Sequence, residues 1–393
     1  MSPGVLENIQ RAVREEGLDG WLFCNFRHRD KLADELLERP GGLANSRFWF
    51  YAVPARGEPE GLVHAIEADH LDGLPGAKKS YVSREDLLRS LAPWAGKRWG
   101  VHVSENLSAV SYLDAGTWAV LGSAGLVLVS AAGLIQRRKG LLDREGLASH
   151  ERTAAALYGV VETVWDFVRA AHGGNRTIYE GDLRQIMEDE FLRLGLTRDH
   201  PPLAAAGRHS SNPHYDFSGG GAAIQKGDVI QLDLWAKEKA PAAIYADISW
   251  AGFFGPEPGE EAERIFGDLV RAREETLRFI EAALGVGKRV TGAEADLQCR
   301  SLLIAGGYGG AIKHRTGHGI DTECHGAGVN IDAVEFPDTR PLLEGSCFSL
   351  EPGIYLADYG FRTEVDVYIS GGAPHVSGAG AQKEGRQFKL LRC

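Results

Sequence analysis

Three histidines lie within one short, glycine-interrupted stretch, HRTGHGIDTECHG at residues 314–326. They are His314, His318 and His325, and the glycines around them disfavour a continuous helix. The His314–His318 spacing is not a zinc-binding HExxH motif, because that motif needs a glutamate where this chain has Arg315. Imidazoles bind metal ions and transfer protons near neutral pH. The stretch therefore predicts a site whose other members come from elsewhere in the chain.

Acidic residues in four strand-like segments are the candidate partners. A carboxylate inside such a segment is costly to bury unless it is paired, protonated or bound to a metal. Any one of them alone is better explained as facing solvent. Together with His318 they form an oxygen-rich set suited to two divalent ions that share bridging carboxylates. The four are Asp233 in DVIQLDLW, Asp247 in IYADISW, Glu351 in CFSLEPGIY and Glu364 in FRTEVDVYI.

Two-residue alternation indicates which face of each strand these acids occupy. In DVIQLDLW, Asp233 lies opposite the apolar row of Ile230, Leu232 and Leu234. Along FRTEVDVYI, read as one strand, Arg362 and Glu364 share a face with Asp366. In CFSLEPGIY, Glu351 directly precedes a Pro-Gly turn. We therefore expect the acids to project from the polar faces of a sheet.

The composition narrows the class of protein. A chain of 393 residues predicts two domains, and 44% hydrophobic with 25% charged residues is typical of a globular protein. A net charge of -11 argues against general binding to nucleic acid or anionic membranes. Five scattered cysteines without CxxC pairing indicate reduced thiols. With no signal-peptide pattern and no membrane-length apolar run, we expect a cytoplasmic protein.

The order of predicted elements divides the chain. Residues 1–140 alternate short helical and strand-like runs, which predicts an α/β domain, and the charged segment 136–146 marks its boundary. Residues 141–393 show two successive helix–helix–strand halves, which predict a pseudo-symmetric α+β domain. Helices are predicted at 147–171, 179–195, 259–284 and 291–307, the last with Thr291 as N-cap.

The motifs LDL…ADIS, HRTGHG, EPGIY and FRTEVD resemble those of the pita-bread metallopeptidases. That family includes prolidase, Xaa-Pro aminopeptidase and methionine aminopeptidase, with creatinase as a non-peptidase relative. The resemblance runs from about residue 147 to the end, and the first 140 residues more loosely resemble the creatinase-type N-terminal domain of the proline-specific members. It implies a smaller creatinase-like N-terminal α/β domain at 1–140 and a pita-bread catalytic domain at 141–393.

The resemblance also implies the role of each metal ligand. Asp233 would bind one ion, His318 and Glu351 would bind the other, and Asp247 and Glu364 would bridge both. The donor types suit manganese, zinc or cobalt as the two divalent ions. Glu351 would in addition act as general base and then general acid.

The same resemblance gives roles to four further residues. His325 would contact the substrate and stabilise the tetrahedral intermediate, and His214 in SNPHYDFSGGG would bind the substrate from the opposite wall. Arg362 would orient the carboxylates. His314 matches a family position near the metal pocket and would also bind the substrate, but a purely structural, hydrogen-bonded histidine explains it equally well.

Two features depart from the family pattern. Asp233 and Asp247 are fourteen positions apart, more than is usual, so AKEKAPAA is predicted to be an enlarged connection between paired strands. The segment EFPDTRP stands where dipeptidases of the family anchor the substrate carboxylate with an arginine, and Arg340 within it is predicted to support the loop instead.

Hydrolysis of Xaa-Pro peptide bonds is the activity that the resemblance implies. The compact chain favours an Xaa-Pro dipeptidase (prolidase), whose substrate is a small peptide with proline in second position. Three alternatives stay open: an Xaa-Pro aminopeptidase on longer peptides, a non-peptidase hydrolase or lyase on the same scaffold, and a scaffold without catalysis. A homodimer is expected from the family, without nucleic-acid or membrane partners.

Overall fold

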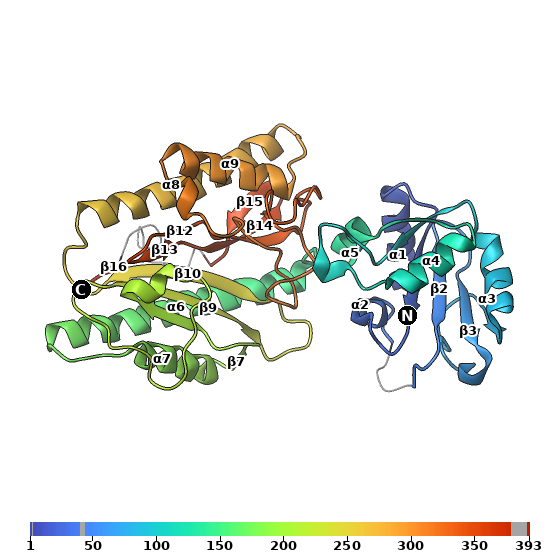
Figure 1. Cartoon of the computed structure of the whole chain (residues 1–393), viewed down its shortest axis with the longest axis horizontal. Coiled ribbons are helices and arrows are strands. Elements are labelled where there is room, and N and C mark those ends of the chain that lie inside the picture. Colours follow the sequence, from blue (N-terminus) through green and yellow to red (C-terminus); the bar gives the residue numbers. More distant parts are fainter. Residues whose placement is uncertain (2, 40–43, 379–390) are drawn as a thin grey trace. The chain divides into compact units, whose positions relative to one another are not determined.

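A computed structural model describes residues 1, 3–39, 44–378 and 391–393 of the chain. The contacts divide it into two compact units, Met1–Lys139 and Gly140–Cys393 (Figure 1). One apolar cluster, which includes Leu22, Phe50 and Trp99, lies within the first unit, and separate clusters lie within the second. Each unit is therefore described by itself.

The first unit is built on a six-stranded mixed sheet in the order β4-β3-β2-β1-β5-β6. The predicted α/β domain is confirmed in its class, and its edge strand β4 has the polar, mostly exposed sequence AKKSY. The strands are β1 (Gly20–Asn25), β2 (Trp49–Pro54), β3 (Glu60–His64), β4 (Ala77–Tyr81), β5 (Arg98–Val101) and β6 (Val127–Ser130). The helices are α1 (Pro3–Glu15), α2 (Lys31–Leu36), α3 (Arg84–Leu91), α4 (Ala115–Ser123) and α5 (Ala132–Lys139).

Four helices enclose the strands of the second unit: α6 (Arg144–Gly173), α7 (Glu180–Arg193), α8 (Glu260–Gly285) and α9 (Gly292–Ala305). In Figure 1, α6 and α7 lie on one side of the strands and α8 and α9 on the other. The four helices predicted from the sequence are confirmed to within a few residues at each end. The Thr291 N-cap is also confirmed, since its hydroxyl accepts a hydrogen bond from the Glu294 N–H.

One sheet of this unit carries the two aspartates of interest. Its strands are β7 (Leu196–Thr197), β8 (Leu203–Ala206), β9 (Val229–Glu238), β10 (Ala246–Phe253) and β16 (Leu391–Arg392). Strand β10 packs so closely on α6 that a Cβ at Gly252 would lie 1.9 Å from the Trp165 ring. Strand β9 extends to Glu238, where it pairs with β7. Part of the enlarged 236–243 connection is therefore strand rather than loop.

The remaining strands carry the two glutamates. They are β11 (Cys347–Leu350), β12 (Gly353–Tyr355), β13 (Gly360–Arg362), β14 (Val365–Ser370) and β15 (Ala373–Val376). The prediction of one continuous strand along 361–369 is wrong, because the chain leaves the ladder after Arg362 and the Glu364 N–H donates to Ser249 O instead. Strand β11 pairs with β14, and β12 pairs with β13. Glu351 therefore lies at the break between β11 and β12, and Glu364 lies at the matching break between β13 and β14.

Apolar side chains at helical spacing hold α6 against this framework. Leu157, Val161, Val164 and Val168 are all buried in one apolar cluster, together with residues of β9 and β10. Burial of each such side chain stabilises the fold by roughly 1.5–3 kcal/mol. Across the described part of the chain, no helix is long and apolar enough to cross a membrane.

Candidate metal centre

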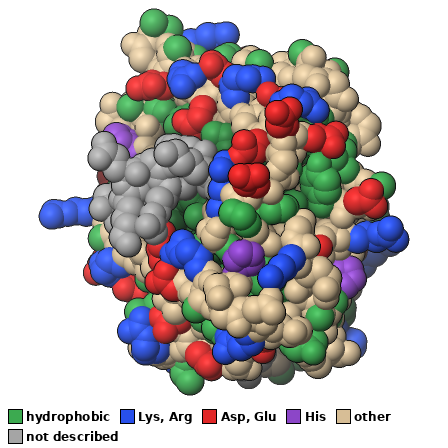
Figure 2. All heavy atoms as spheres, turned by 90° about the vertical axis from the view of Figure 1, so that its left-hand side faces the viewer, with side chains coloured by type: hydrophobic (Ala, Val, Ile, Leu, Met, Phe, Trp, Pro, Cys, Tyr) green, Lys and Arg blue, Asp and Glu red, His purple; other side chains and the backbone are tan. Residues whose placement is uncertain are grey.

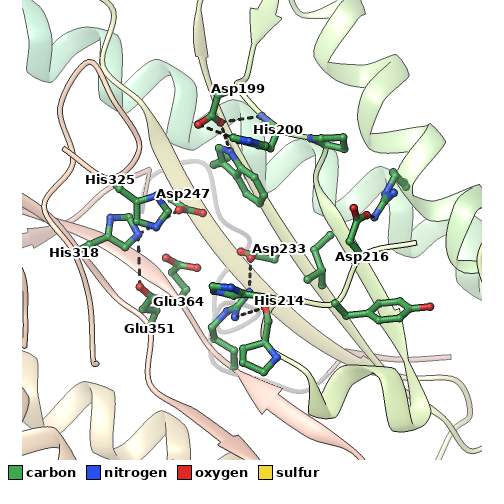
Figure 3. Close-up of a pocket in the computed structure, with 17 residues that line it drawn as sticks. Asp199, His200, His214, Asp216, Asp233, Asp247, His318, His325, Glu351 and Glu364 are labelled. Atoms are coloured by element: carbon green, nitrogen blue, oxygen red, sulfur yellow. Dashed lines mark hydrogen bonds and ion pairs between the residues drawn. The ribbon is translucent and has the colours of Figure 1, made fainter. Parts of the chain in front are cut away.

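A cavity of about 520 Å³ opens in the second unit, beside the breaks at Glu351 and Glu364 (Figure 3). Eight of the nine residues predicted for the site line it. These are Asp233, Asp247, His318, Glu351, Glu364, His214, His325 and Arg362. The ninth, His314, lies apart from the lining. The structure thus brings residues from six separate segments to one place.

The four carboxylates reach the cavity from two hairpins. On the β9–β10 hairpin Asp233 pairs with Ser249, and Asp247 pairs with Trp235. Paired residues share a face, as do residues two apart, so all four side chains lie on one side of the sheet. Glu351 and Glu364 come from the breaks in the second hairpin. Figure 3 shows the four acids converging on a common space.

His318, which comes from the histidine-rich stretch, joins the four carboxylates as the fifth candidate metal ligand. Its Nε2 lies 3.5 Å from both Asp247 Oδ2 and Glu351 Oε1. The stretch lies directly on β11: the Glu351 N–H donates to Thr316 O, and a Cβ at Gly317 would lie 1.9 Å from Ser349 O. The glycine before His318 is therefore required for this close approach, which places the imidazole over the carboxylates.

A buried hydrogen-bond network sets the orientation of the carboxylates. The Ser249 Oγ lies 2.7 Å from Asp233 Oδ1 and 2.8 Å from Glu364 Oε2. The Arg362 Nε donates to the Ser249 Oγ at 2.9 Å, and its Nη2 forms an ion pair with Asp233. A buried guanidinium fixed in this way restricts the rotation of the acids around it.

Two buried carboxylate oxygens without hydrogen-bond partners in the described part of the chain indicate whether this site fits a cation. Among the described residues, Asp247 Oδ1 and Glu364 Oε1 have no hydrogen-bond partner. Burial and the neighbouring Asp233 raise the pKa of Asp247, and burial and Asp247 raise that of Glu364. Such acids need a positive charge in order to ionise together. The orphaned oxygens therefore fit a bound metal.

The donor atoms fall into overlapping groups. Those of Asp233, Asp247 and Glu364 lie within 4.8 Å of one another, as do those of His318, Glu351 and Glu364. Carboxylate oxygens and an imidazole are donors that divalent cations accept. Because Glu364 belongs to both groups, the arrangement fits divalent metal ions on either side of it.

The two histidines predicted to contact substrate occupy different walls. The His325 ring centroid lies 4.2 Å from that of His318. His318 and then burial lower the pKa of His325 to about 4, so its imidazole is neutral at physiological pH. His214 is exposed and comes from the loop before β9, on the Asp233 side of the cavity (Figure 3).

His314 and Arg340 serve the surrounding framework. The Nε2 of His314 lies 2.7 Å from the Tyr355 hydroxyl and its Nδ1 2.6 Å from Arg315 O, which favours the structural alternative. Arg340 donates to the carbonyls of Ala327 and Gly328 and pairs with Asp338. Its predicted support of the loop is confirmed.

Sequence reasoning missed other residues of the cavity. The Trp235 Nε1 donates to Asp199 Oδ1 at 2.7 Å, and His200 lines the cavity next to them. Trp235 could have been found, because alternation along β9 puts it on the face of Asp233. Asp199 and His200 lie between β7 and β8, where no periodic pattern guides prediction. The remaining lining residues are Arg184, Pro201, Leu203, Pro213, Tyr215 and Asp216.

Residues 148–371, more than half of the chain, match the model of metallopeptidase family M24. The chain belongs to metallopeptidase family M24. Within this family it is 31% identical to an Xaa-Pro dipeptidase from Lactobacillus delbrueckii subsp. lactis over 169 residues, 41% of this chain and 40% of that protein. It is 32% identical to an uncharacterized peptidase from Bacillus subtilis over 175 residues, 43% of each chain. The chain thus spans less than half the length of these curated relatives.

Solved structures resemble the M24 chain over nearly its whole length. A dipeptidase from Mycobacterium ulcerans has a TM-score of 0.71 at 20% identity, covering 99% of this chain and 97% of the other. An Xaa-Pro dipeptidase from Bacillus anthracis has a TM-score of 0.65 at 17% identity, covering 99% of each chain. These similarities confirm the pita-bread fold with its preceding α/β domain.

The same fold also occurs in a protein that is not named as a peptidase. The N-terminal domain of a FACT complex subunit from chickpea has a TM-score of 0.66 at 13% identity, covering 96% of this chain and 95% of that one. A shared fold by itself therefore leaves the activity of this M24 chain to be argued from its site.

Proposed function

We propose that this protein hydrolyses Xaa-Pro peptide bonds with two divalent metal ions and that it is an Xaa-Pro dipeptidase. The observation that carries the proposal is the pair of donor groups sharing Glu364, with unpartnered buried oxygens on Asp247 and Glu364. The named activity of the Lactobacillus relative supports the substrate class.

The metal ligands in this proposal are Asp233, Asp247, His318, Glu351 and Glu364. Manganese, zinc and cobalt all suit oxygen donors with one imidazole. When bound, such ions lower the pKa of a water molecule and polarise the substrate carbonyl. Arg362 and Ser249 hold the carboxylates in place, so the side chains do not need to reorganise during the reaction.

Glu351 is the group proposed to move the proton. Burial opposes its ionisation, but the imidazoles of His318 and His314 and the Arg362 guanidinium outweigh burial and lower the pKa of Glu351. As a carboxylate it accepts a proton from the attacking water, whose oxygen adds to the carbonyl carbon. It then delivers that proton to the proline nitrogen as the C–N bond breaks.

His325 and His214 are the proposed substrate contacts. A neutral His325 has one N–H to donate to the oxygen that becomes negative in the tetrahedral intermediate, and such a donor is commonly worth about 3 kcal/mol. His214 would hold the proline side of the peptide. The Xaa-Pro bond has no N–H to recognise, so recognition must rest on the carbonyl, the ring and the termini.

The size of the cavity supports a small substrate. At about 520 Å³ it lies within the range of roughly 300–1,000 Å³ typical of sites for small ligands. A dipeptide fits such a volume, and this favours the dipeptidase over an aminopeptidase that binds an extended chain.

Proline release from an Xaa-Pro dipeptide and from an Xaa-Pro-Xaa tripeptide tests the proposal. Both assays use chelator-treated protein to which manganese, cobalt or zinc is returned. Metal-dependent cleavage of the dipeptide alone supports the dipeptidase, and cleavage of both supports the aminopeptidase. Cleavage of neither by metal-loaded protein overturns the peptidase proposal and directs attention to a non-peptide substrate.

We also propose a cytoplasmic homodimer. All five cysteines are free, which suits a reducing compartment. On the face shown in Figure 2, acidic and basic side chains are interspersed rather than gathered by sign. Light scattering on the purified protein tests the oligomeric state, and cell fractionation tests the location.

A further inference from the structure

Cys324 lies against the candidate metal centre and has no part in the proposed mechanism. Its side chain is buried, and its Sγ lies 3.0 Å from Asp247 Oδ2. It directly precedes His325 in the histidine-rich stretch that also carries His318. The fold therefore brings a thiol to one of the carboxylates that line the cavity.

The geometry around this thiol is that of a ligand group. The donor atoms of Asp247, His318 and Cys324 all lie within 4.8 Å of one another, and all three residues are buried. The pairwise separations of 3.0 Å from Sγ to Asp247 Oδ2 and 3.5 Å from Oδ2 to His318 Nε2 are close to those between atoms bound to one ion, roughly 3–4 Å.

The neighbouring carboxylate gives a second indication that this group fits a cation. Asp247 is only 5% exposed, and its Oδ1 has no hydrogen-bond partner among the described residues. The thiol S–H satisfies Oδ2 alone, so hydrogen bonding from Cys324 leaves half of the buried carboxylate unsatisfied. A cation bound by Asp247 would satisfy the carboxylate and draw the sulfur toward itself.

We infer that Cys324 is a metal ligand, supplying a sulfur donor to the ion that His318 and Asp247 also hold. The centre then combines carboxylates, an imidazole and a thiolate, rather than carboxylates and imidazole alone. This inference rests on the proposed metal centre and is independent of which bond the enzyme cleaves.

Coordination changes the protonation of the thiol. Without a cation, burial and Asp247 raise the pKa of Cys324, so the sulfur keeps its proton and donates to the carboxylate. A divalent ion reverses this balance, since a coordinating thiol is deprotonated outright. As the metal–sulfur bond forms, the S–H bond breaks and the proton passes to water. One proton is released for each thiol bound.

A sulfur ligand alters which metal the centre prefers. Thiolates are soft donors that favour zinc and related ions, whereas manganese prefers oxygen donors. The Cys324→Ser variant keeps a small polar group of similar shape but loses the sulfur. Zinc affinity is expected to fall at least about tenfold in this variant, with manganese affinity little changed.

Cobalt(II) is the probe for the sulfur ligand, because a cobalt–thiolate bond gives an intense near-ultraviolet charge-transfer band. Chelator-treated protein is reconstituted with cobalt, its metal content is measured by mass spectrometry, and its absorption spectrum is recorded. We expect the band in the natural protein and in Cys299→Ala, a buried cysteine on α9 outside the donor group, and its loss in Cys324→Ser.

Three results would overturn the inference. Cobalt bound without the band excludes a sulfur ligand, as does a band unchanged in Cys324→Ser, and in both cases proline release by the same samples can still uphold the proposed function. Failure to bind cobalt overturns the ligand inference, and failure to bind manganese and zinc as well overturns the proposed function too. A band with no proline release upholds the ligand and removes the peptidase. If Cys324→Ser does not fold, the spectra of the natural protein, Cys299→Ala and Cys347→Ala are compared. A band present in all three upholds the inference, and a band absent from the natural protein overturns it.

Discussion

Ser249 and Asp233 face each other across the β9–β10 pair, with 2.7 Å between the serine Oγ and the aspartate Oδ1. The same Oγ lies 2.8 Å from Glu364 Oε2, on the other hairpin. A hydroxyl has one hydrogen to donate, so it serves one carboxylate at a time while accepting from Arg362. Ser249 thereby connects two proposed metal ligands that belong to different parts of the sequence.

Replacing Ser249 with alanine should weaken metal binding by about 10- to 100-fold, because the carboxylates lose the group that orients them. A competition titration with a zinc chelator measures this change. Ser301→Ala, on the exposed side of α9, is the matched control and should leave affinity unchanged. Equal affinities in both variants would show that the hydroxyl does not organise the site.

Removing the metal should lower the melting temperature of the protein. The proposed ligands come from both hairpins and the histidine-rich stretch, so ions bound only by the folded state stabilise it. At a free metal concentration of a hundred times Kd this amounts to about 2.7 kcal/mol for one site. Thermal denaturation with and without chelator tests this, and Asp247→Asn should abolish the difference. An identical Tm in both conditions contradicts the centre.

Glu351→Gln should reduce kcat by about 10²- to 10⁴-fold, because an amide cannot accept the proton from water. Its carbonyl oxygen still offers a ligand atom, so much of the bound metal should remain. Proline release and metal content are measured on the same preparation. Glu281→Gln, exposed on α8, controls for the loss of one negative charge. An unchanged kcat would assign the proton transfer to another group.

His150 should make the fold sensitive to mild acid. Its Nδ1 lies 2.6 Å from Tyr245 O and its Nε2 2.7 Å from Ser377 Oγ, and burial lowers its pKa, so the folded protein keeps it neutral. In the unfolded chain it takes up a proton below its ordinary pKa of about 6.5. Its contribution to stability is therefore complete above that pH and declines as the pH falls below it.

Melting temperatures between pH 7.5 and 5 check this behaviour. His150→Gln keeps hydrogen-bonding groups at the position but cannot titrate, so its curve should fall less steeply with acid than that of the natural protein. Parallel curves would mean that His150 does not contribute to the acid sensitivity.

Local sequence patterns were sufficient to predict features that depend on neighbouring residues, such as the face of a strand or the start of a helix. Alternation along 229–235 placed Asp233 on a polar face, and Thr291 as a predicted N-cap marked the start of α9. The break at Glu364 could not be predicted in this way, because it depends on Ser249 O from a distant strand.

The surroundings of the site were harder to predict for a similar reason. Asp199 is placed by a hydrogen bond from Trp235, which is remote in sequence. Cys324 becomes notable only once the fold puts it beside Asp247. Long-range pairing of this kind leaves no periodic signal in a single sequence.

The breaks that carry Glu351 and Glu364 lie late in the sequence, after Asp233 and Asp247. This order has a consequence for events during synthesis. The ribosome delivers Asp233 and Asp247 well before β11–β14 exist, so the emerging chain first presents two aspartates with neither Glu364 nor His318. Chains are made from the N-terminus, and domains fold as units. The proposed metal centre is complete only after Glu364 has left the exit tunnel, so metal loading at that centre would belong to the last stage of translation or follow it.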